Sequence, residues 1–215
     1  IVNGLVGSEM CIRDSDGTRL TELDLSNNVN LQHLYCGQNQ LGVLDLTNQP
    51  NLISLDVYSN ALSEINLISN PLIENLNLSS NTLSEINLIS NPLIQQLNLG
   101  SNELTQIDLS NLENLYHLTI ANNNLTQLDL SANLLLRDLN CAVNQLTDLN
   151  VEANTELQWI QCSRNSIESL NVSSNINLRL LEINNLLISE VDLTNNVNLE
   201  RLWVHDNSLI SLDLS

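Results

Sequence analysis

Aliphatic residues recur along this chain with a period of 21 residues, and no insertion or deletion interrupts the series. The series runs through Leu20, Leu41, Leu62, Leu83, Leu104, Leu125, Leu146, Ile167, Ile188 and Leu209. When each repeat is numbered from 1 to 21 from these residues, positions 1, 4, 6, 12, 15 and 17 always hold an aliphatic residue or Cys. Alternation of apolar and polar residues indicates extended chain. We therefore expect a short strand near positions 14–18 and a second extended segment near positions 3–7.

A repeat of this length predicts a mainly β solenoid. Twenty-one residues are too few for a strand, a long helix and two turns, so little or no helix is expected. One coil cannot offset the entropy cost of its own ordering, whereas stacked coils share backbone hydrogen bonds and cover each other's apolar side chains. We expect a parallel sheet on one face of the solenoid and short extended segments, or a second sheet, on the other.

Asparagine marks two further positions of the repeat. Position 20 is Asn in eight of nine repeats, with Leu186 as the exception. Position 9 is Asn in seven of nine, with Gln49 and Leu112 as the exceptions. An Asn side chain both donates and accepts hydrogen bonds. We expect these amides to turn inward at the corners of each coil and to bond the backbone of the loops.

Each repeat thus contains the pattern L-x-x-L-x-L-x-x-N twice, and this pattern resembles the leucine-rich repeat family. The likeness is closest to the bacterial 21-residue subclass with a nested half-repeat, in which Leu-Asp-Leu follows Asn-x-Leu, as it does in residues 39–46. It covers residues 20–215. The resemblance implies a solenoid whose sheet is the usual ligand surface.

The chain divides into a short leader and one repeat domain. Residues 5–15 resemble a translated sequencing adapter, so we expect residues 1–15 to be a non-native segment. We expect residues 16–215 to form a single domain of nine repeats and a truncated tenth, without a cap at either end. Because terminal repeats normally need caps, we expect the isolated domain to fray or associate at its ends, and the full-length protein to be monomeric.

The charge and hydropathy of the chain limit the kinds of partner that it can bind. The chain has 25 acidic and six basic side chains and a formal net charge of -19. Such a chain repels phosphate backbones, so nucleic acid is not expected as a partner. Its apolar runs are too short to cross a membrane. The leader carries no signal that fixes localisation, and only the family resemblance favours the cell surface or the extracellular space.

Function is expected on the outward face of the strand segment. All three His, both Trp and two of the three Tyr occupy positions 14, 16 and 18. Exposed aromatic residues are typical of binding hot spots. One patch comprises His33, Tyr35, Asp56 and Tyr58, and a second comprises Trp159, Leu180, Glu182, Arg201, Trp203 and His205. His117 lies between them, near an amide-rich stretch of Asn75, Asn77, Gln96 and Asn98.

Three functions fit this surface. We favour a non-enzymatic module that binds a protein partner, the second is a glycan-binding or adhesive solenoid, and the third is the recognition domain of a larger enzyme. No Ser-His-Asp grouping, phosphate-binding loop or paired Cys spacing appears, so no catalytic residue, metal site or cofactor is predicted. Cys36, Cys141 and Cys162 share position 17 and are expected to be small buried apolar residues.

The second extended segment carries a regular series of acidic or amide side chains. Position 5 is Asp or Asn in every repeat, and position 3 adds further carboxylates. Two interpretations are open: a cation-binding row of oxygen ligands, or a solvated acidic face that opposes aggregation. The second is favoured, because calcium sites need ligands that converge from loops.

Overall fold

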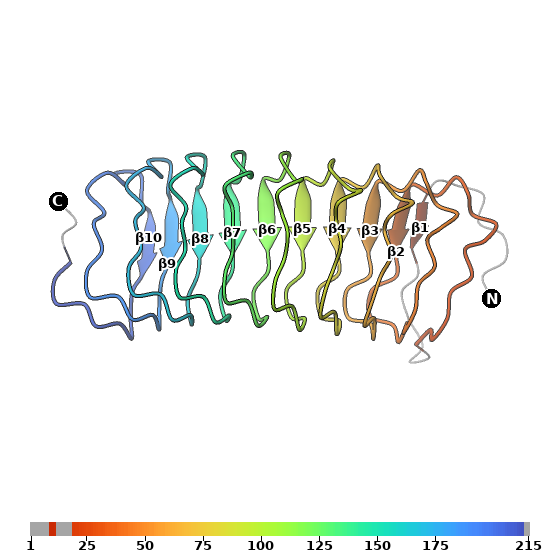
Figure 1. The fold of residues 1–215 in the computed structure, drawn as a ribbon, viewed down its shortest axis with the longest axis horizontal. Helices are drawn as coiled ribbons and strands as arrows, with labels where there is room; N and C mark the ends of the chain where they lie inside the picture. The colour runs from red at the N-terminus through yellow and green to blue at the C-terminus, as the bar shows by residue number, and fades with distance from the viewer. Residues whose placement is uncertain (1–8, 12–18, 213–215) are drawn as a thin grey trace.

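The computed structural model describes residues 9–11 and 19–212, and these residues form an elongated solenoid (Figure 1). A single parallel sheet of ten strands runs along it, and the strands pair in sequence order. Each strand has three residues: β1 Glu9–Cys11, β2 His33–Tyr35, β3 Ser54–Asp56, β4 Asn75–Asn77, β5 Gln96–Asn98, β6 His117–Thr119, β7 Asp138–Asn140, β8 Trp159–Gln161, β9 Leu180–Glu182 and β10 Arg201–Trp203. Strands β2 to β10 occupy repeat positions 14–16.

The register of the sheet follows the repeat. From β2 onward, each residue pairs with the one 21 positions later, as His33 does with Ser54 and Tyr35 with Asp56. Backbone bonds between coils continue past the strand, because the N–H of Gln38 at position 19 donates to the carbonyl of Tyr58 in the next coil. A constant repeat length therefore aligns equivalent side chains in columns about 4.8 Å apart.

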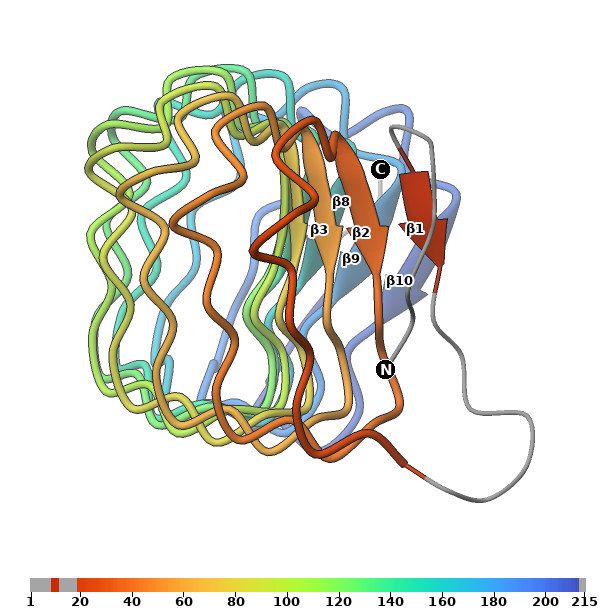
Figure 2. The same cartoon turned by 90° about the vertical axis from the view of Figure 1, so that its right-hand side faces the viewer.

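The other side of each coil is extended but does not form a second sheet. Figure 2, viewed along the stack, shows the strands on one side and smoothly extended chain on the opposite side. In the part of the chain that the structure describes, that opposite side contains turns and one isolated bridge residue, Asp192, and no helix occurs anywhere. The predicted mainly β solenoid is confirmed, with extended segments opposite the sheet.

The core consists of the predicted aliphatic columns. Leu118 and Ile120 of one strand segment are fully buried, as are Leu104 and Leu115 of the same coil. Burial falls at both ends of the stack, where Leu20, Leu202 and Val204 are partly buried, and at position 4 in repeats 3 to 5, where Ile65, Ile86 and Ile107 are partly buried. Because each column is shared by neighbouring coils, burial of one side chain requires the coil beside it, which makes the stack cooperative.

The position 20 asparagines close each coil. In Asn123, Oδ1 accepts from the N–H of Leu104, and Nδ2 donates to the carbonyls of Leu99 in the preceding coil and Ile120 in its own coil, all at 3.0–3.1 Å. The same arrangement recurs at the position 20 asparagines from Asn60 to Asn165, whereas Asn39 bonds only its own coil. The inward orientation predicted for these amides is confirmed. At Leu186 the series is broken, and no asparagine oxygen accepts from Ile167.

The position 9 asparagines serve the opposite corner through their donors. The Nδ2 of Asn133 donates to the carbonyls of Leu109 and Leu112 in the preceding coil at 3.1 and 2.9 Å. Asn154 and Asn175 repeat this pattern one and two coils further on. Both corners are thus tied to the coil before them by side-chain amides.

Position 19 adopts a left-handed backbone in all nine repeats. Its φ angles lie between 51° and 58° although none of these residues is glycine: Gln38, Ser59, Ser80, Ser101, Asn122, Val143, Arg164, Asn185 and Asp206. This conformation turns the chain out of the strand and toward the residue at position 20, which is Asn in every repeat except that of Leu186. It costs free energy for any side chain, and most for a β-branched one such as Val143.

The first strand lies in the segment that the sequence led us to set aside. β1 pairs in parallel with β2, joining Glu9 to His33 and Cys11 to Tyr35, and so extends the sheet by one strand. Residues 1–8 and 12–15 of that segment lie outside the described residues. The non-native origin of residues 1–15 and the missing caps stay predictions.

Candidate functional site

The acidic series at position 5 has a structural role. In repeat 5 an Oδ1 of Asp108 accepts from the backbone N–H and the hydroxyl of Ser110, at 2.9 and 2.6 Å. These bonds lower the pKa of Asp108, the hydroxyl contributing most. The equivalent turn in repeat 3 is made by Asn66 and Ile68, so an amide serves as well as a carboxylate. A turn that needs one acceptor oxygen therefore accounts for the Asp or Asn at position 5.

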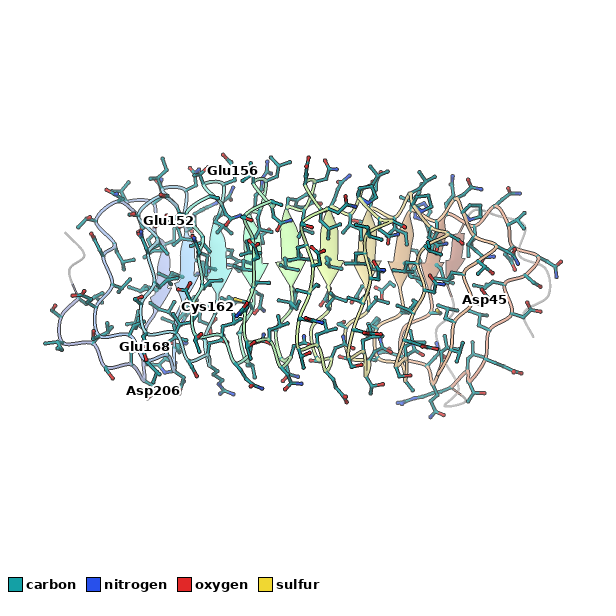
Figure 3. All side chains as sticks on the ribbon, in the orientation of Figure 1. Asp45, Glu152, Glu156, Cys162, Glu168 and Asp206 are labelled. Carbon is teal, nitrogen blue, oxygen red and sulfur yellow. The ribbon has the colours of Figure 1, made fainter. Side chains whose placement is uncertain are left out.

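Charge is divided between the two sides of the solenoid. From residue 19 to residue 212, the sheet side (positions 13–19) carries six carboxylates and four arginines, whereas the remaining positions carry fifteen carboxylates and Arg19 alone. Figure 3 places Glu156 and Asp206 at opposite rims, with Cys162 between them. The sheet side is thus nearly neutral, although the chain as a whole is strongly acidic.

The first predicted patch is contiguous in the structure. The rings of His33 and Tyr35 are parallel, with centroids 6.5 Å apart. Asp56 pairs with Tyr35 across the sheet, and its Oδ1 accepts from the N–H of Tyr58 at 3.3 Å. The ring of Tyr58 lies against Gly37 of the preceding coil. These four side chains form a half-buried aromatic surface over β2 and β3.

The middle of the sheet is polar and shallowly hollowed. Its depression of about 360 Å³ is lined by Tyr35, Ser54, Leu55, Asp56, Asn75, Leu76, Asn77, Gln96, Leu97, Asn98 and His117. At its far edge the Nδ1 of His117 lies 3.5 Å from an oxygen of Asp138, and both side chains are about one-third exposed. The predicted amide-rich stretch therefore joins the first patch to His117.

The second predicted patch covers β8, β9 and β10. Trp159, Leu180 and Arg201 pair in register on successive strands, and Glu182 pairs with Trp203. The indoles of Trp159 and Trp203 are 43% and 39% exposed, which is unusual for so large an apolar side chain. His205 is exposed beside them and contacts Asp206 at 2.7 Å. The structure thus brings together all six residues predicted here.

Two expectations about this face were wrong in part. Position 18 lies beyond the strand and is not uniformly outward, because Gly37, Gly100, Ser163 and Asn184 are buried under the neighbouring coil. Leu180 is only 4% exposed and forms the floor of the second patch instead of projecting from it. The large ring of Trp159 beside it and the long side chain of Arg201 rise above this floor.

The residues at position 13 also border this face, although the sequence pattern did not predict them as site residues. A depression of about 290 Å³ on the second patch is lined by Asp138, Gln158, Trp159, Arg179, Leu180, Glu200 and Arg201, and three of these occupy position 13. Arg179 donates to Glu200 through its Nε at 2.8 Å. Position 13 precedes the predicted strand pattern, so alternation alone gave no sign that it borders the site. The concentration of Arg and Glu there was the available signal.

A second group was also missed, on the side away from the sheet. Repeats 3 and 4 share an identical block of twelve residues, 62–73 and 83–94. Within it Ile68, Leu72, Ile89 and Leu93 are between 39% and 67% exposed. Position 7 is Ser, Thr or Glu in the other repeats, so these two isoleucines depart from the pattern.

The described cysteines belong to the core. Cys36, Cys141 and Cys162 are free thiols with no exposed surface. Burial raises the pKa of Cys36 and Cys141 to about 12, and it also raises the pKa of Cys162. A thiol that stays protonated is a poor nucleophile, so these residues behave as buried apolar side chains.

The comparisons with known proteins agree on the fold. No protein-family model and no curated protein sequence matches the chain. The functional domain of InlJ from Listeria monocytogenes, described as including a cysteine ladder, is 29% identical with a TM-score of 0.82; the match covers 96% of this chain and 50% of that one. An internalin, InlF, from the same species is 23% identical with a TM-score of 0.83, covering 89% and 63%.

A plant protein has the same fold. The ectodomain of the receptor kinase GASSHO1/SCHENGEN3 from Arabidopsis thaliana, solved in complex with Casparian strip integrity factor 2, is 26% identical with a TM-score of 0.76; the match covers 87% of this chain and 25% of that one. The chain thus spans less than two thirds of the length of each of these structures. In the described part, no helix is long and apolar enough to span a bilayer. The chain is a leucine-rich repeat domain that resembles those of the bacterial internalins.

Proposed function

We propose that this domain is a non-enzymatic scaffold that binds a protein partner through the outward face of its sheet. The observation that carries the proposal is the segregation of side chains. All three His and both Trp lie on one nearly neutral surface, whereas the charged residues that lie elsewhere in residues 19–212 are all acidic except Arg19. Partially exposed indoles lower solubility, so their placement on one face is best explained by an interface that covers them.

The relatives support the same conclusion. One of the similar structures is a complex of a leucine-rich repeat ectodomain with a named protein factor. The internalin resemblance favours a surface or secreted protein, with the domain acting as a monomer within a longer chain. On the sheet, the hydroxyl of Thr119 lies 3.4 Å from the Nε2 of His117, and the Nδ1 of His117 lies 3.5 Å from Asp138. Both contacts are at the outer limit of hydrogen bonding, so we propose binding rather than catalysis.

A glycan ligand is the second candidate. The amide side chains of Asn75, Asn77, Gln96 and Asn98 line the central depression together with Tyr35. Amides offer both donors and acceptors to hydroxyl groups, and an aromatic ring packs on the apolar face of a sugar. A third candidate, the recognition domain of a larger enzyme, depends on parts of the protein beyond this chain.

The test compares two double variants with the wild type. Trp159→Ala with Trp203→Ala removes the indoles from the sheet. Ile68→Ser with Ile89→Ser removes a comparable exposed apolar surface from the opposite side and introduces the residue that other repeats carry at position 7. All three proteins are immobilised and exposed to secreted and cell-surface extracts of the source organism and, in parallel, to a glycan array.

We expect at least one protein that the wild type and the isoleucine variant retain and the tryptophan variant loses. Proteins retained equally by all three would contradict binding through the sheet. Glycans retained by the wild type and lost from the tryptophan variant, with no protein behaving so, would favour the second candidate.

A further inference from the structure

The arginines of the repeat array gather at one end of the sheet side. Arg137, Arg164, Arg179 and Arg201 are the only basic residues from Leu20 onward other than His, and all four occupy positions 13, 14 or 19 of repeats 6 to 9. A chain with a net charge of -19 would be expected to spread its few cations for charge balance. Their restriction to the surroundings of the second patch indicates a local role.

The depression is lined by two carboxylates and two arginines, but these charges are not all paired with one another. Arg179 is paired with Glu200, and Asp138 lies beside His117. Arg201 makes no ion pair with any residue that the structure describes, although it borders the same depression. The depression therefore contains one exposed guanidinium that lacks a carboxylate partner among the described residues.

The apolar parts of the depression adjoin this guanidinium directly. Leu180 is paired with Arg201 on one side and with Trp159 on the other, so one aliphatic floor separates an indole from a cation by two strand spacings, about 10 Å. An indole and a leucine favour a hydrocarbon side chain, and a guanidinium offers two parallel N–H donors that match a carboxylate. A ligand that carries an aliphatic residue next to an acidic residue would satisfy both preferences.

We propose that this depression receives an acidic segment of the protein partner, in which an aliphatic side chain sits on Leu180 against Trp159 and a neighbouring Asp or Glu pairs with Arg201. The inference rests on the proposed function and adds the chemistry of the partner. The remaining surface favours the same choice, because its fifteen carboxylates repel an acidic segment from every other face. A basic segment would instead be attracted to the side away from the sheet.

The experiment uses a displayed library of random 12-residue peptides selected against the immobilised wild-type chain. Three variants are screened in parallel: Arg201→Gln, which removes the unpaired cation; Arg164→Gln, which removes an exposed arginine outside the depression; and Trp159→Ala with Trp203→Ala. Circular dichroism confirms the fold of each variant. The wild type is expected to enrich peptides in which Asp or Glu adjoins Leu, Ile or Val.

Arg201→Gln is expected to weaken binding of an enriched peptide about tenfold in fluorescence anisotropy, since a charged hydrogen-bonded pair is lost, and Arg164→Gln is expected to leave it unchanged. Enrichment of basic or uncharged peptides, equal binding to Arg201→Gln, or no enrichment at all overturns the inference. Peptides that bind the tryptophan variant as well as the wild type contradict the proposed function itself, so the two failures are distinguishable.

Discussion

The ring of Tyr58 occupies the space into which a side chain on Gly37 would project. Two ring carbons, Cδ1 and Cε1, lie 2.3 Å from the position of a Cβ on Gly37, and the backbone oxygen of Tyr58 lies 3.1 Å from it. Glycine at position 37 therefore allows the aromatic ring of one coil to fold back over the coil before it, which shapes the first patch.

Replacement of Gly37 by Ala should displace the Tyr58 ring into solvent. We expect a loss of about 1–2 kcal/mol in the free energy of unfolding, because the ring can rotate away but the backbone contact cannot relax as easily. Gly42→Ala is the matched control, since nothing lies within 4 Å of its added Cβ. Urea unfolding measures the stability of both variants. If Gly37→Ala is as stable as Gly42→Ala and the NMR signals of the Tyr58 ring do not shift, the packing of Tyr58 against Gly37 is contradicted.

Replacement of Val143 by Asn should stabilise the domain. Val143 has a φ of 56°, a conformation that Asn accepts more readily than a β-branched residue, and Asn already occupies this position in Asn122 and Asn185. We expect a gain of about 1 kcal/mol. Thermal unfolding followed by circular dichroism is the measurement, and an unchanged or lower Tm would show that the Val side chain contributes more than the backbone strain costs.

Truncation of an asparagine at position 20 should strongly destabilise the domain. Asn123→Ala removes the acceptor of the Leu104 N–H and donors to two buried carbonyls. A loss of about 2–3 kcal/mol is expected, because a buried donor is left without a partner. Asn124→Ala, at the exposed neighbouring residue, should change stability by less than about 0.5 kcal/mol. Similar urea midpoints for the two variants would exclude a structural role for the corner amide.

The buried cysteines should resist alkylation in the folded protein. With the pKa of Cys36 and Cys141 raised to about 12, almost no thiolate exists near neutral pH, and none of the three side chains is accessible. We expect iodoacetamide to modify them only in denaturant, as resolved by peptide mass spectrometry. A Ser131→Cys variant, exposed in a loop, supplies the reactive reference. Rapid native labelling of Cys141 or Cys162 would indicate that the coils open locally.

Removal of the Ser110 hydroxyl should raise the pKa of Asp108 toward its ordinary value, because that hydroxyl is the largest cause of the lowered pKa. A depressed carboxylate pKa stabilises the fold above the unfolded-state value, and this contribution disappears as the pH falls through the folded-state value. Ser110→Ala should therefore be less stable than the wild type near pH 7 and equal to it near pH 2. NMR titration of Asp108 and urea unfolding at both pH values test this; an unmoved titration midpoint would refute it.

The sequence was sufficient to predict the repeat, the inward columns and the corner amides. These features depend on spacing alone: a constant 21-residue period places Leu118 beside Leu139 and Asn123 beside Asn144 in any stack of equal coils. The concentration of Trp159, Trp203 and the histidines on one face followed in the same way, from the alternation of side chains along a strand.

Other features depend on the contacts between neighbouring coils and could not be predicted from the spacing of residues alone. The left-handed backbone at position 19 has no sequence signature, since Gln, Ser, Asn, Val, Arg and Asp all occupy it, and it occurs even at Asn185, which is followed by Leu186 instead of Asn. The burial of Gly37 and Leu180 likewise depends on the sizes of their neighbours in adjacent coils. Periodicity thus fixes which columns face inward, whereas the depth of each outward residue, and hence the depression beside Arg201, arises from contacts between residues 21 positions apart.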